Sequence, residues 1–321
     1  MKKSHLVNIG AFFITIIFIS ILLTQISILD IFKTLSEINP LYLIGGFILY
    51  TGSIFLRAYR FNILLNYEVG IEELFSITCV HNMINNLLPA RTGELSYIYL
   101  LKKINKRTTG EGVATLIVAR IFDFISLSAL FFLGVILVND IPGFIKNALW
   151  IIIFFVIFLS VILVTLLFAG RKFVISIQRT LEKFHFQNNR IALYIGKKGL
   201  ETVDSLEKIK IKKNVFLLMI ISTLIWGFNY LLLFLLISAM NFQISYFIVI
   251  LGGSFILLTS VLPIQGLGGF GTTEAVWTLI FVPLGMPLEE AIISGFCFHI
   301  ISIVFYLLLG GYGIVKLKIF R

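Results

Sequence analysis

The sequence predicts an all-α fold: a polytopic integral membrane helical bundle of about six full spans plus two broken or re-entrant hairpins, about eight hydrophobic segments in all. Three observations predict it. The mean hydropathy is +1.02, and only 13% of the 321 residues are charged, against roughly 25% in soluble domains. Several apolar runs are long enough to cross a hydrocarbon core of about 30 Å. Two hydrophobic segments contain prolines and clustered glycines, which break helices.

Six apolar runs account for the full spans. The first, 6–29, carries no charge and has a length of about 36 Å as a helix. Its basic start is typical of a signal peptide, but the run is too long and no small-x-small cleavage site follows, so we expect a retained helix. The others are 41–56, 113–139, 148–169, 215–240 and 291–315. We expect one transmembrane domain over residues 1–321.

Two further hydrophobic segments, about 74–101 and 246–287, each contain a helix-breaking motif. These motifs are NNLLPARTGE at 85–94 and SVLPIQGLGGFGTTE at 260–274. Broken backbone at membrane depth is tolerated only where protein or a watery cavity satisfies its polar groups. Paired broken segments in corresponding places point to a substrate site in transporters. The residues expected to break the helices are Pro89, Gly93, Pro263, Gly266, Gly268, Gly269 and Gly271.

The net charge of +10 is unevenly distributed, and its distribution predicts the orientation. Lys and Arg concentrate in cytoplasmic loops, and here they are dense at 102–107, 171–213 and 316–321. Arg57 and Arg60 follow the run 41–56 and count with these cytoplasmic charges. We therefore expect a multi-pass protein of the cytoplasmic (plasma) membrane with both termini in the cytoplasm.

In this orientation, the first broken segment enters and leaves from the cytoplasmic side, and the second from the outer side. Each lies between two spanning runs, so the chain divides into two units of reversed direction. Such an inverted repeat supports alternating access around a midplane site. Residue identity between the units is slight, so hydropathy and motif placement alone predict the repeat.

The longest polar stretch, 171–213, holds eleven Lys or Arg and four acidic residues. Apolar residues recur in it at helical spacing, so we expect helices that lie on the anionic inner leaflet. A connector that is basic only because it is cytoplasmic is the alternative. A basic stretch beside a membrane does not require nucleic acid, and we expect no nucleic-acid partner.

Glu274 is the only formally charged residue between Lys213 and Glu289. A carboxylate at membrane depth is costly unless it is paired, hydrated or protonated. Because Glu274 follows the glycine-rich motif and opens an apolar run, it is predicted to cap a half-helix. Two roles stay open: a purely structural cap, or a cap that also lines a substrate path, since a helix N-terminus offers free N–H groups to an anion.

The first break contains Arg91 and Glu94, just past Pro89. Their spacing allows them to pair, or Arg91 binds a phosphate. The residues before the break form one polar stripe at helical spacing: His81, Asn82, Asn85 and Asn86. Such a stripe faces the bundle, where it lines a substrate path or makes interhelical hydrogen bonds.

Arg120 and Asp123 have i, i+3 spacing inside the run 113–139 and are predicted to pair towards the bundle. The pair is either functional or a structural contact. His299 either relays protons or is a hydrogen-bonded buried histidine. The predicted substrate-binding residues are Asn82, Asn85, Asn86, Arg91, Glu94, Arg120, Asp123, Gln265 and Glu274.

Enzyme signatures are missing from the sequence. It contains no nucleophile elbow, no phosphate-binding P-loop, no Rossmann fingerprint and no paired metal ligands. Cys79 and Cys297 lie in apolar surroundings and are expected to be small buried hydrophobes. We expect no catalytic residue, no metal and no cofactor.

Three motifs in this order resemble the flippase-like membrane family typified by the N-terminal transmembrane domain of the bifunctional lysylphosphatidylglycerol synthase/flippase. They are NLLPARTGE at 86–94, ARIFD at 119–123 and LPIQGLGGFGTTE at 262–274. The resemblance implies translocation of a polar lipid headgroup. It does not extend to a soluble aminoacyltransferase domain, so synthase activity is not expected. Ala119 and His299 depart from the family pattern, which leaves the charge of the cavity and the identity of the lipid open.

The leading hypothesis is a lipid flippase whose substrate is an aminoacylated phospholipid or a polyprenyl-linked or glycosylated lipid. The alternative is a membrane-embedded transferase or accessory subunit in the synthesis of lipid-linked glycans or aminoacyl lipids. A third class is a small-solute or ion transporter. The expected partners are membrane lipids and lipid-modifying or glycosyltransferase enzymes, and the oligomeric state stays open.

Overall fold

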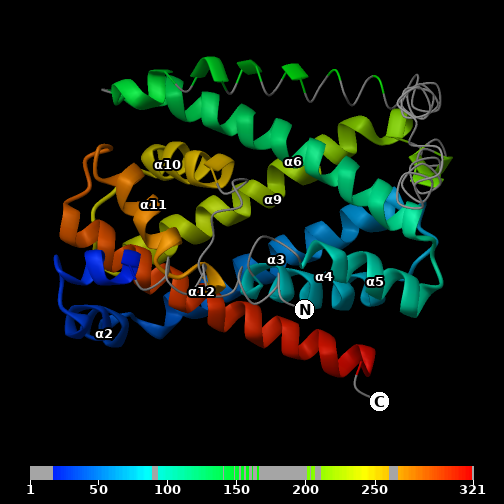
Figure 1. Ribbon diagram of the computed structural model, residues 1–321, viewed down its shortest axis with the longest axis horizontal. Helices are drawn as coiled ribbons and strands as arrows, with labels where there is room; N and C mark the ends of the chain where they lie inside the picture. The colour runs from blue at the N-terminus through cyan, green and yellow to red at the C-terminus, as the bar shows by residue number, and fades with distance from the viewer. Residues whose placement is uncertain are drawn as a thin grey trace, which may run out of the picture.

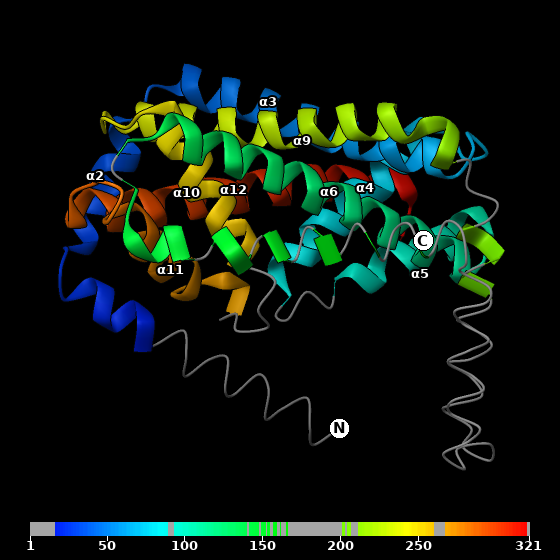
Figure 2. The same cartoon turned by 90° about the horizontal axis from the view of Figure 1, so that it is seen from above.

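The computed structural model describes residues 17–88, 93–139, 141–147, 149–151, 153–154, 157–158, 161, 165, 201–202, 204–206, 211–259 and 267–319. Within these residues all regular secondary structure is helical (Figures 1 and 2). A short helix, Ile17–Leu23, comes first. The labelled elements are α2 (Ile28–Glu37), α3 (Pro40–Leu64), α4 (Ile71–Leu87), α5 (Glu94–Asn105), α6 (Thr109–Leu137), α9 (Ile211–Ala239), α10 (Tyr246–Thr259), the 3-10 helix η3 (Leu267–Gly269), α11 (Thr272–Phe281) and α12 (Leu288–Leu317).

Four of these helices are long and apolar enough to cross a membrane: α3, α6, α9 and α12. The short first helix and α2 together make a fifth candidate span, although they are bent by 78°. The chain is therefore an all-helical membrane protein with four or five candidate spans in its described part. The predicted run 148–169 and the basic stretch 171–213 lie largely outside the described residues.

The predicted first helix does not continue to residue 29. It ends at Leu23, and α2 starts at Ile28 in a new direction. The Ser27 hydroxyl accepts a hydrogen bond from the Leu29 N–H at 3.2 Å, and the Asp30 carboxylate accepts one from the Ser27 N–H at 2.9 Å. This reciprocal capping box starts a second helix inside an apolar run.

The second predicted span was placed too short, because α3 continues past residue 56 to Leu64. Arg57 and Arg60 therefore lie inside this helix, and the prediction that they are charges of a cytoplasmic loop is wrong. The Arg60 residue is only 1% exposed. The apolar run ends at Arg57 in the sequence, but the helix continues and the side chain of Arg60 is buried in the bundle.

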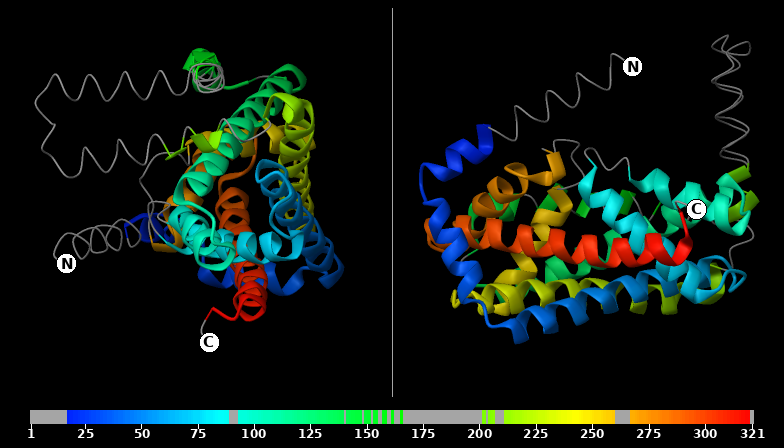
Figure 3. Two further views of the ribbon diagram at one scale, coloured as in Figure 1. Left: turned by 90° about the vertical axis from the view of Figure 1, so that its right-hand side faces the viewer. Right: turned by 90° about the horizontal axis from the view of Figure 1, so that it is seen from below.

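Both predicted helix breaks are present in the structure. α4 ends at Leu87 before α5 begins, and α10 ends at Thr259 before α11 begins. The two hairpins extend into the bundle from opposite ends (Figure 3), α4 and α5 from one and α10 and α11 from the other. Pro89, Pro263 and Gly266 lie outside the described residues.

Glycine is required at both breaks for different reasons. A Cβ atom on Gly93 would overlap the backbone of Ile84 and Asn85, so only glycine lets α5 start directly against α4. Gly268, Gly269 and Gly271 have φ angles of 60°, 82° and 79°, in the region that glycine occupies at little cost.

The helices pack as the two predicted units require. α3 packs along α9, α4 packs along α12, and α10 packs along α6. In the predicted repeat, α3 corresponds to α9, α4 to α10 and α6 to α12. The α4–α12 contact is then equivalent to the α10–α6 contact, and the α3–α9 contact joins two equivalent helices. The inverted repeat stays a prediction, and this pairing supports it.

Substitution at Gly313 tests the contact between α12 and α4. A Cβ atom there would lie 2.6 Å from the Ser76 carbonyl oxygen, and small residues are what allow helix backbones in membranes to approach closely. We expect Gly313→Ala to cost about 1–3 kcal/mol of stability through overpacking, measured as a lower melting temperature in detergent. A Cβ at Gly311 meets nothing within 4 Å, so Gly311→Ala should melt at or above the wild-type temperature. Identical melting of the two variants would contradict the close contact.

Candidate functional site

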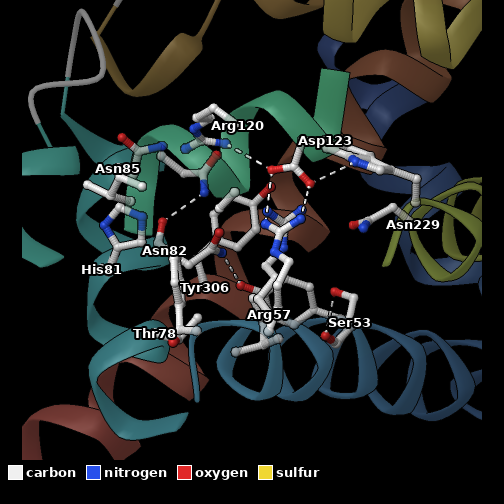
Figure 4. Close-up of a pocket in the computed structure, with 18 residues that line it drawn as sticks. Ser53, Arg57, Thr78, His81, Asn82, Asn85, Arg120, Asp123, Asn229 and Tyr306 are labelled. Carbon is white, nitrogen blue, oxygen red and sulfur yellow. Dashed lines mark hydrogen bonds and ion pairs between the residues drawn. The ribbon is translucent and has the colours of Figure 1, made fainter. Parts of the chain in front are cut away.

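A cavity of about 170 Å³ lies between α3, α4, α6, α9 and α12 (Figure 4). Its wall is mostly polar, although the helices around it are apolar. The polar and aromatic side chains that line it are Tyr50, Ser53, Arg57, Arg60, Phe61, Thr78, His81, Asn82, Asn85, Asn86, Arg120, Asp123, Trp226, Asn229 and Tyr306.

The polar stripe on α4 faces this cavity. The Asn82 amide donates a hydrogen bond to the Tyr50 hydroxyl at 2.6 Å, and the Asn86 amide donates to the Asn82 carbonyl oxygen at 2.7 Å. The buried Oδ1 atom of Asn85 has no hydrogen-bond partner within the part of the chain that the structure describes. His81 Nδ1 lies 3.2 Å from the Gly93 carbonyl oxygen and 3.4 Å from the Ser96 hydroxyl of α5. The stripe therefore lines the cavity and also makes hydrogen bonds to neighbouring helices, so both interpretations from the sequence describe part of it.

Asp123 is held by a buried network. Its carboxylate accepts two hydrogen bonds from the Arg60 guanidinium, at 2.6 and 3.1 Å, and one from the indole N–H of Trp226 at 3.1 Å. Arg60 also donates to the Ser222 hydroxyl at 2.8 Å. This bidentate pair joins α3, α6 and α9. The predicted partner Arg120 lies farther away, with 3.6 Å between Nη1 and the carboxylate.

The closest partner of Arg120 is Glu94 in the first turn of α5. The Arg120 Nη2 and Nε atoms lie 2.7 and 3.0 Å from the Glu94 carboxylate. About a third of each side chain is exposed, 36% and 32% respectively. Glu94 therefore connects the first hairpin to α6 through a partly exposed ion pair. The other predicted partner, Arg91, lies outside the described residues.

Arg57 differs from the other two arginines because it has no carboxylate partner among the described residues. Its buried Nε atom also lacks a hydrogen-bond partner. The guanidinium carbon lies 5.2 Å from the centre of the Trp226 ring, a cation–π contact that leaves the N–H groups available. The described part of the site contains the three arginines Arg57, Arg60 and Arg120 and the two carboxylates Asp123 and Glu94. It therefore has one formal positive charge in excess.

Glu274 forms a second polar cluster, apart from the residues that line this cavity. It is completely buried. One carboxylate oxygen accepts a hydrogen bond from the Gly271 N–H at 2.7 Å and so caps α11, as predicted. The other lies 2.6 Å from Nδ1 of His299, whose Nε2 lies 3.0 Å from the Gly268 carbonyl oxygen. His299 is thus a hydrogen-bonded buried histidine, and Gln265 lies outside the described residues.

The two clusters occupy equivalent places in the two units. Arg120 and His299 are each the twelfth residue of a spanning helix, α6 and α12. Each contacts a glutamate in the first turn of the helix that follows a break, Glu94 in α5 and Glu274 in α11. Each hairpin is therefore attached to its spanning helix by the same kind of contact.

Sequence reasoning missed Arg57 and Arg60 as site residues. A signal was present, because Tyr50, Ser53, Arg57 and Arg60 recur at intervals of three and four residues, which places them on one helical face. A polar face of this kind indicates a helix that continues through the charges.

The chemistry available in the cavity is anion binding. The two cysteines are buried and free, one on α4 and one on α12, so they behave as the predicted small hydrophobes. In the described part of the chain, no group of three or more His, Cys, Asp or Glu side chains is arranged to hold a metal ion.

Comparisons with known proteins agree with this architecture. Residues 8–310 match the family model described as the lysylphosphatidylglycerol synthase TM region. A UPF0104 membrane protein of Methanocaldococcus jannaschii is 26% identical over 95% of this chain and 93% of its own length. UPF0104 membrane proteins of Methanothermobacter thermautotrophicus and Pyrococcus horikoshii are 27% and 23% identical, over 80% and 98% of this chain and 80% and 97% of their own lengths. No solved structure gives a significant match.

Proposed function

This chain belongs to the family of the lysylphosphatidylglycerol synthase TM region, and we propose that it translocates a lipid with a polar headgroup across the cytoplasmic membrane. The observation that carries the proposal is the polar cavity with an excess positive charge inside a bundle of membrane-spanning helices. Charged side chains within a membrane are costly, and they mark substrate paths.

In this proposal the headgroup enters the cavity and the acyl chains stay in the lipid. Arg57 binds the headgroup phosphate, because its guanidinium has no carboxylate partner in the described residues. The amides of Asn82, Asn85 and Asn86 contact the remaining polar atoms, and Asp123 holds Arg60 in place. Arg91 and Gln265 belong to the two break motifs and complete the proposed path.

Movement of the two hairpins supplies alternating access in this mechanism. The Glu94–Arg120 contact holds the first hairpin to α6, and the Glu274–His299 contact holds the second to α12. Release of one contact at a time opens the cavity towards one side while the other side stays closed. Discontinuous helices around a central site are the usual basis of such movement.

Substitution of Arg57 tests the proposal directly. We expect Arg57→Gln to slow translocation about tenfold or more, because a hydrogen bond to a charged group contributes about 1.5–3 kcal/mol. The measurement is the rate at which a headgroup-labelled lipid becomes accessible to an impermeant quencher after reconstitution in liposomes.

Arg107→Gln is the matched control. Arg107 lies outside the cavity, where it pairs with Glu68 at 2.5 Å on the partly exposed end of the bundle, and surface pairs contribute little. This variant should keep the wild-type rate. If wild type and both variants all match protein-free liposomes, the transport proposal fails.

The same liposomes separate the alternative functions. A membrane-embedded transferase yields a lipid of changed mass in mass spectrometry, whereas a translocator leaves the lipid mass unchanged. A small-solute or ion transporter shows uptake of a solute that does not depend on the lipid supplied.

A further inference from the structure

We infer that the cavity selects an anionic phosphate headgroup that carries hydroxyl groups and no ammonium group. This inference rests on the proposed function, since it names the substrate class of the same site. It favours a phosphoglycerol or sugar-phosphate headgroup over an aminoacylated, cationic one.

The carboxylates at the cavity already have partners. Asp123 accepts hydrogen bonds from Arg60 and Trp226, and Glu94 pairs with Arg120 at 2.7 Å. The break sequences 89–92 and 260–266 contain neither Asp nor Glu. A headgroup ammonium therefore finds no uncommitted carboxylate among the described residues that line the cavity or in these motifs.

The described residues at the cavity leave one positive charge in excess. Arg57, Arg60 and Arg120 all line the cavity, and Arg57 is the arginine whose guanidinium has no carboxylate partner in the described residues. A phosphate placed beside Arg57 neutralises the excess charge and accepts its hydrogen bonds. An ammonium in the same place adds a further positive charge next to three guanidinium groups, which is electrostatically unfavourable.

The cavity also offers a hydrogen-bond acceptor for a hydroxyl group of the ligand. The buried Oδ1 atom of Asn85 is an acceptor without a partner among the described residues, and an unsatisfied buried acceptor is costly. A hydroxyl close to the phosphate donates the missing hydrogen bond without adding charge.

The size of the cavity limits the headgroup. Its volume of about 170 Å³ is close to the roughly 150 Å³ of an engineered protein cavity that holds one benzene molecule. This space admits a phosphate with the first few atoms beyond it, such as a glycerol unit.

A lipid panel tests the inference. Wild-type protein is reconstituted with labelled phosphatidylglycerol, its lysyl ester, phosphatidylcholine or a polyprenyl phosphate that carries one sugar. We expect phosphatidylglycerol or the sugar phosphate to move at least about tenfold faster than the lysyl ester, which carries two ammonium groups; a tenfold ratio corresponds to about 1.4 kcal/mol. Comparison of phosphatidylglycerol with the polyprenyl sugar phosphate distinguishes the two sources of the phosphate. A lysyl ester that moves as fast as the anionic lipids overturns the inference and leaves translocation intact.

Binding provides a readout that is independent of transport. Trp226 lines the cavity beside Arg57, so its fluorescence should respond to glycerol 1-phosphate or short-chain phosphatidylglycerol in detergent. The wild-type protein and Arg107→Gln should bind these anions in preference to ethanolamine or a lysyl ester. Arg57→Gln should lose the preference, and Arg57→Glu should reverse it. Equal binding of anion and amine by wild type contradicts the inference, and binding without movement of any lipid refutes only the transport proposal.

Discussion

Replacing Asp123 with asparagine should destabilise the protein more than any other single change at the site, by about 3–5 kcal/mol. The substitution leaves Arg60, which is only 1% exposed, as a buried cation without its bidentate carboxylate. Arg60 joins α3 to α6 and α9 through Asp123 and Ser222, so the centre of the bundle loosens. The measurement is thermal melting in detergent, followed by circular dichroism and by the monodisperse fraction in gel filtration.

A double-mutant cycle separates the ion pair from other effects. Arg60→Gln together with Asp123→Asn removes both charges, and we expect the double variant to melt above the Asp123→Asn single variant. The coupling should reach about 2 kcal/mol, within the range seen for residues in one network. Purely additive losses would show that the two side chains do not act as a pair.

Glu274→Ala should produce the second largest loss of stability, about 3 kcal/mol, because it removes both a helix cap and a buried charge-assisted contact. Glu274 is fully buried, and its two oxygens contact the Gly271 N–H and His299 Nδ1. Melting in detergent again gives the measurement.

Two further variants complete this prediction. Glu274→Gln keeps the shape, since its amide oxygen accepts from Gly271 and its amide N–H donates to His299, so most of the stability should be retained. Glu289→Ala is the control, because Glu289 is an exposed acid in the first turn of α12 and its loss should cost only about 0.3–1 kcal/mol. A Glu274→Ala variant that melts like Glu289→Ala would be inconsistent with the buried contact.

The sequence was sufficient to predict the features that depend on local chemistry. Proline and clustered glycines predicted where both hairpins break, and the position of Glu274 after the glycine motif predicted its role as a cap. Residue spacing also predicted that the asparagines of α4 share a face, and the structure places that face on the cavity.

Contacts between distant helices were beyond the sequence. Asp123 pairs with Arg60, 63 residues away, and Arg120 pairs with Glu94, 26 residues away. Helical spacing indicates which face a residue occupies but does not identify the neighbouring helix. The end of α3 was misplaced for a related reason, since hydropathy treats a buried, paired arginine as a surface charge.

The equivalent contacts that hold the two hairpins differ in how far the surrounding protein encloses them. Glu94 and Arg120 form an ion pair in which about a third of each side chain is exposed. The His299–Glu274 contact is almost completely enclosed, with 9% and 0% of the side chains exposed. The two hairpins are thus anchored in different surroundings, the first by a partly exposed contact and the second by a contact that the protein encloses.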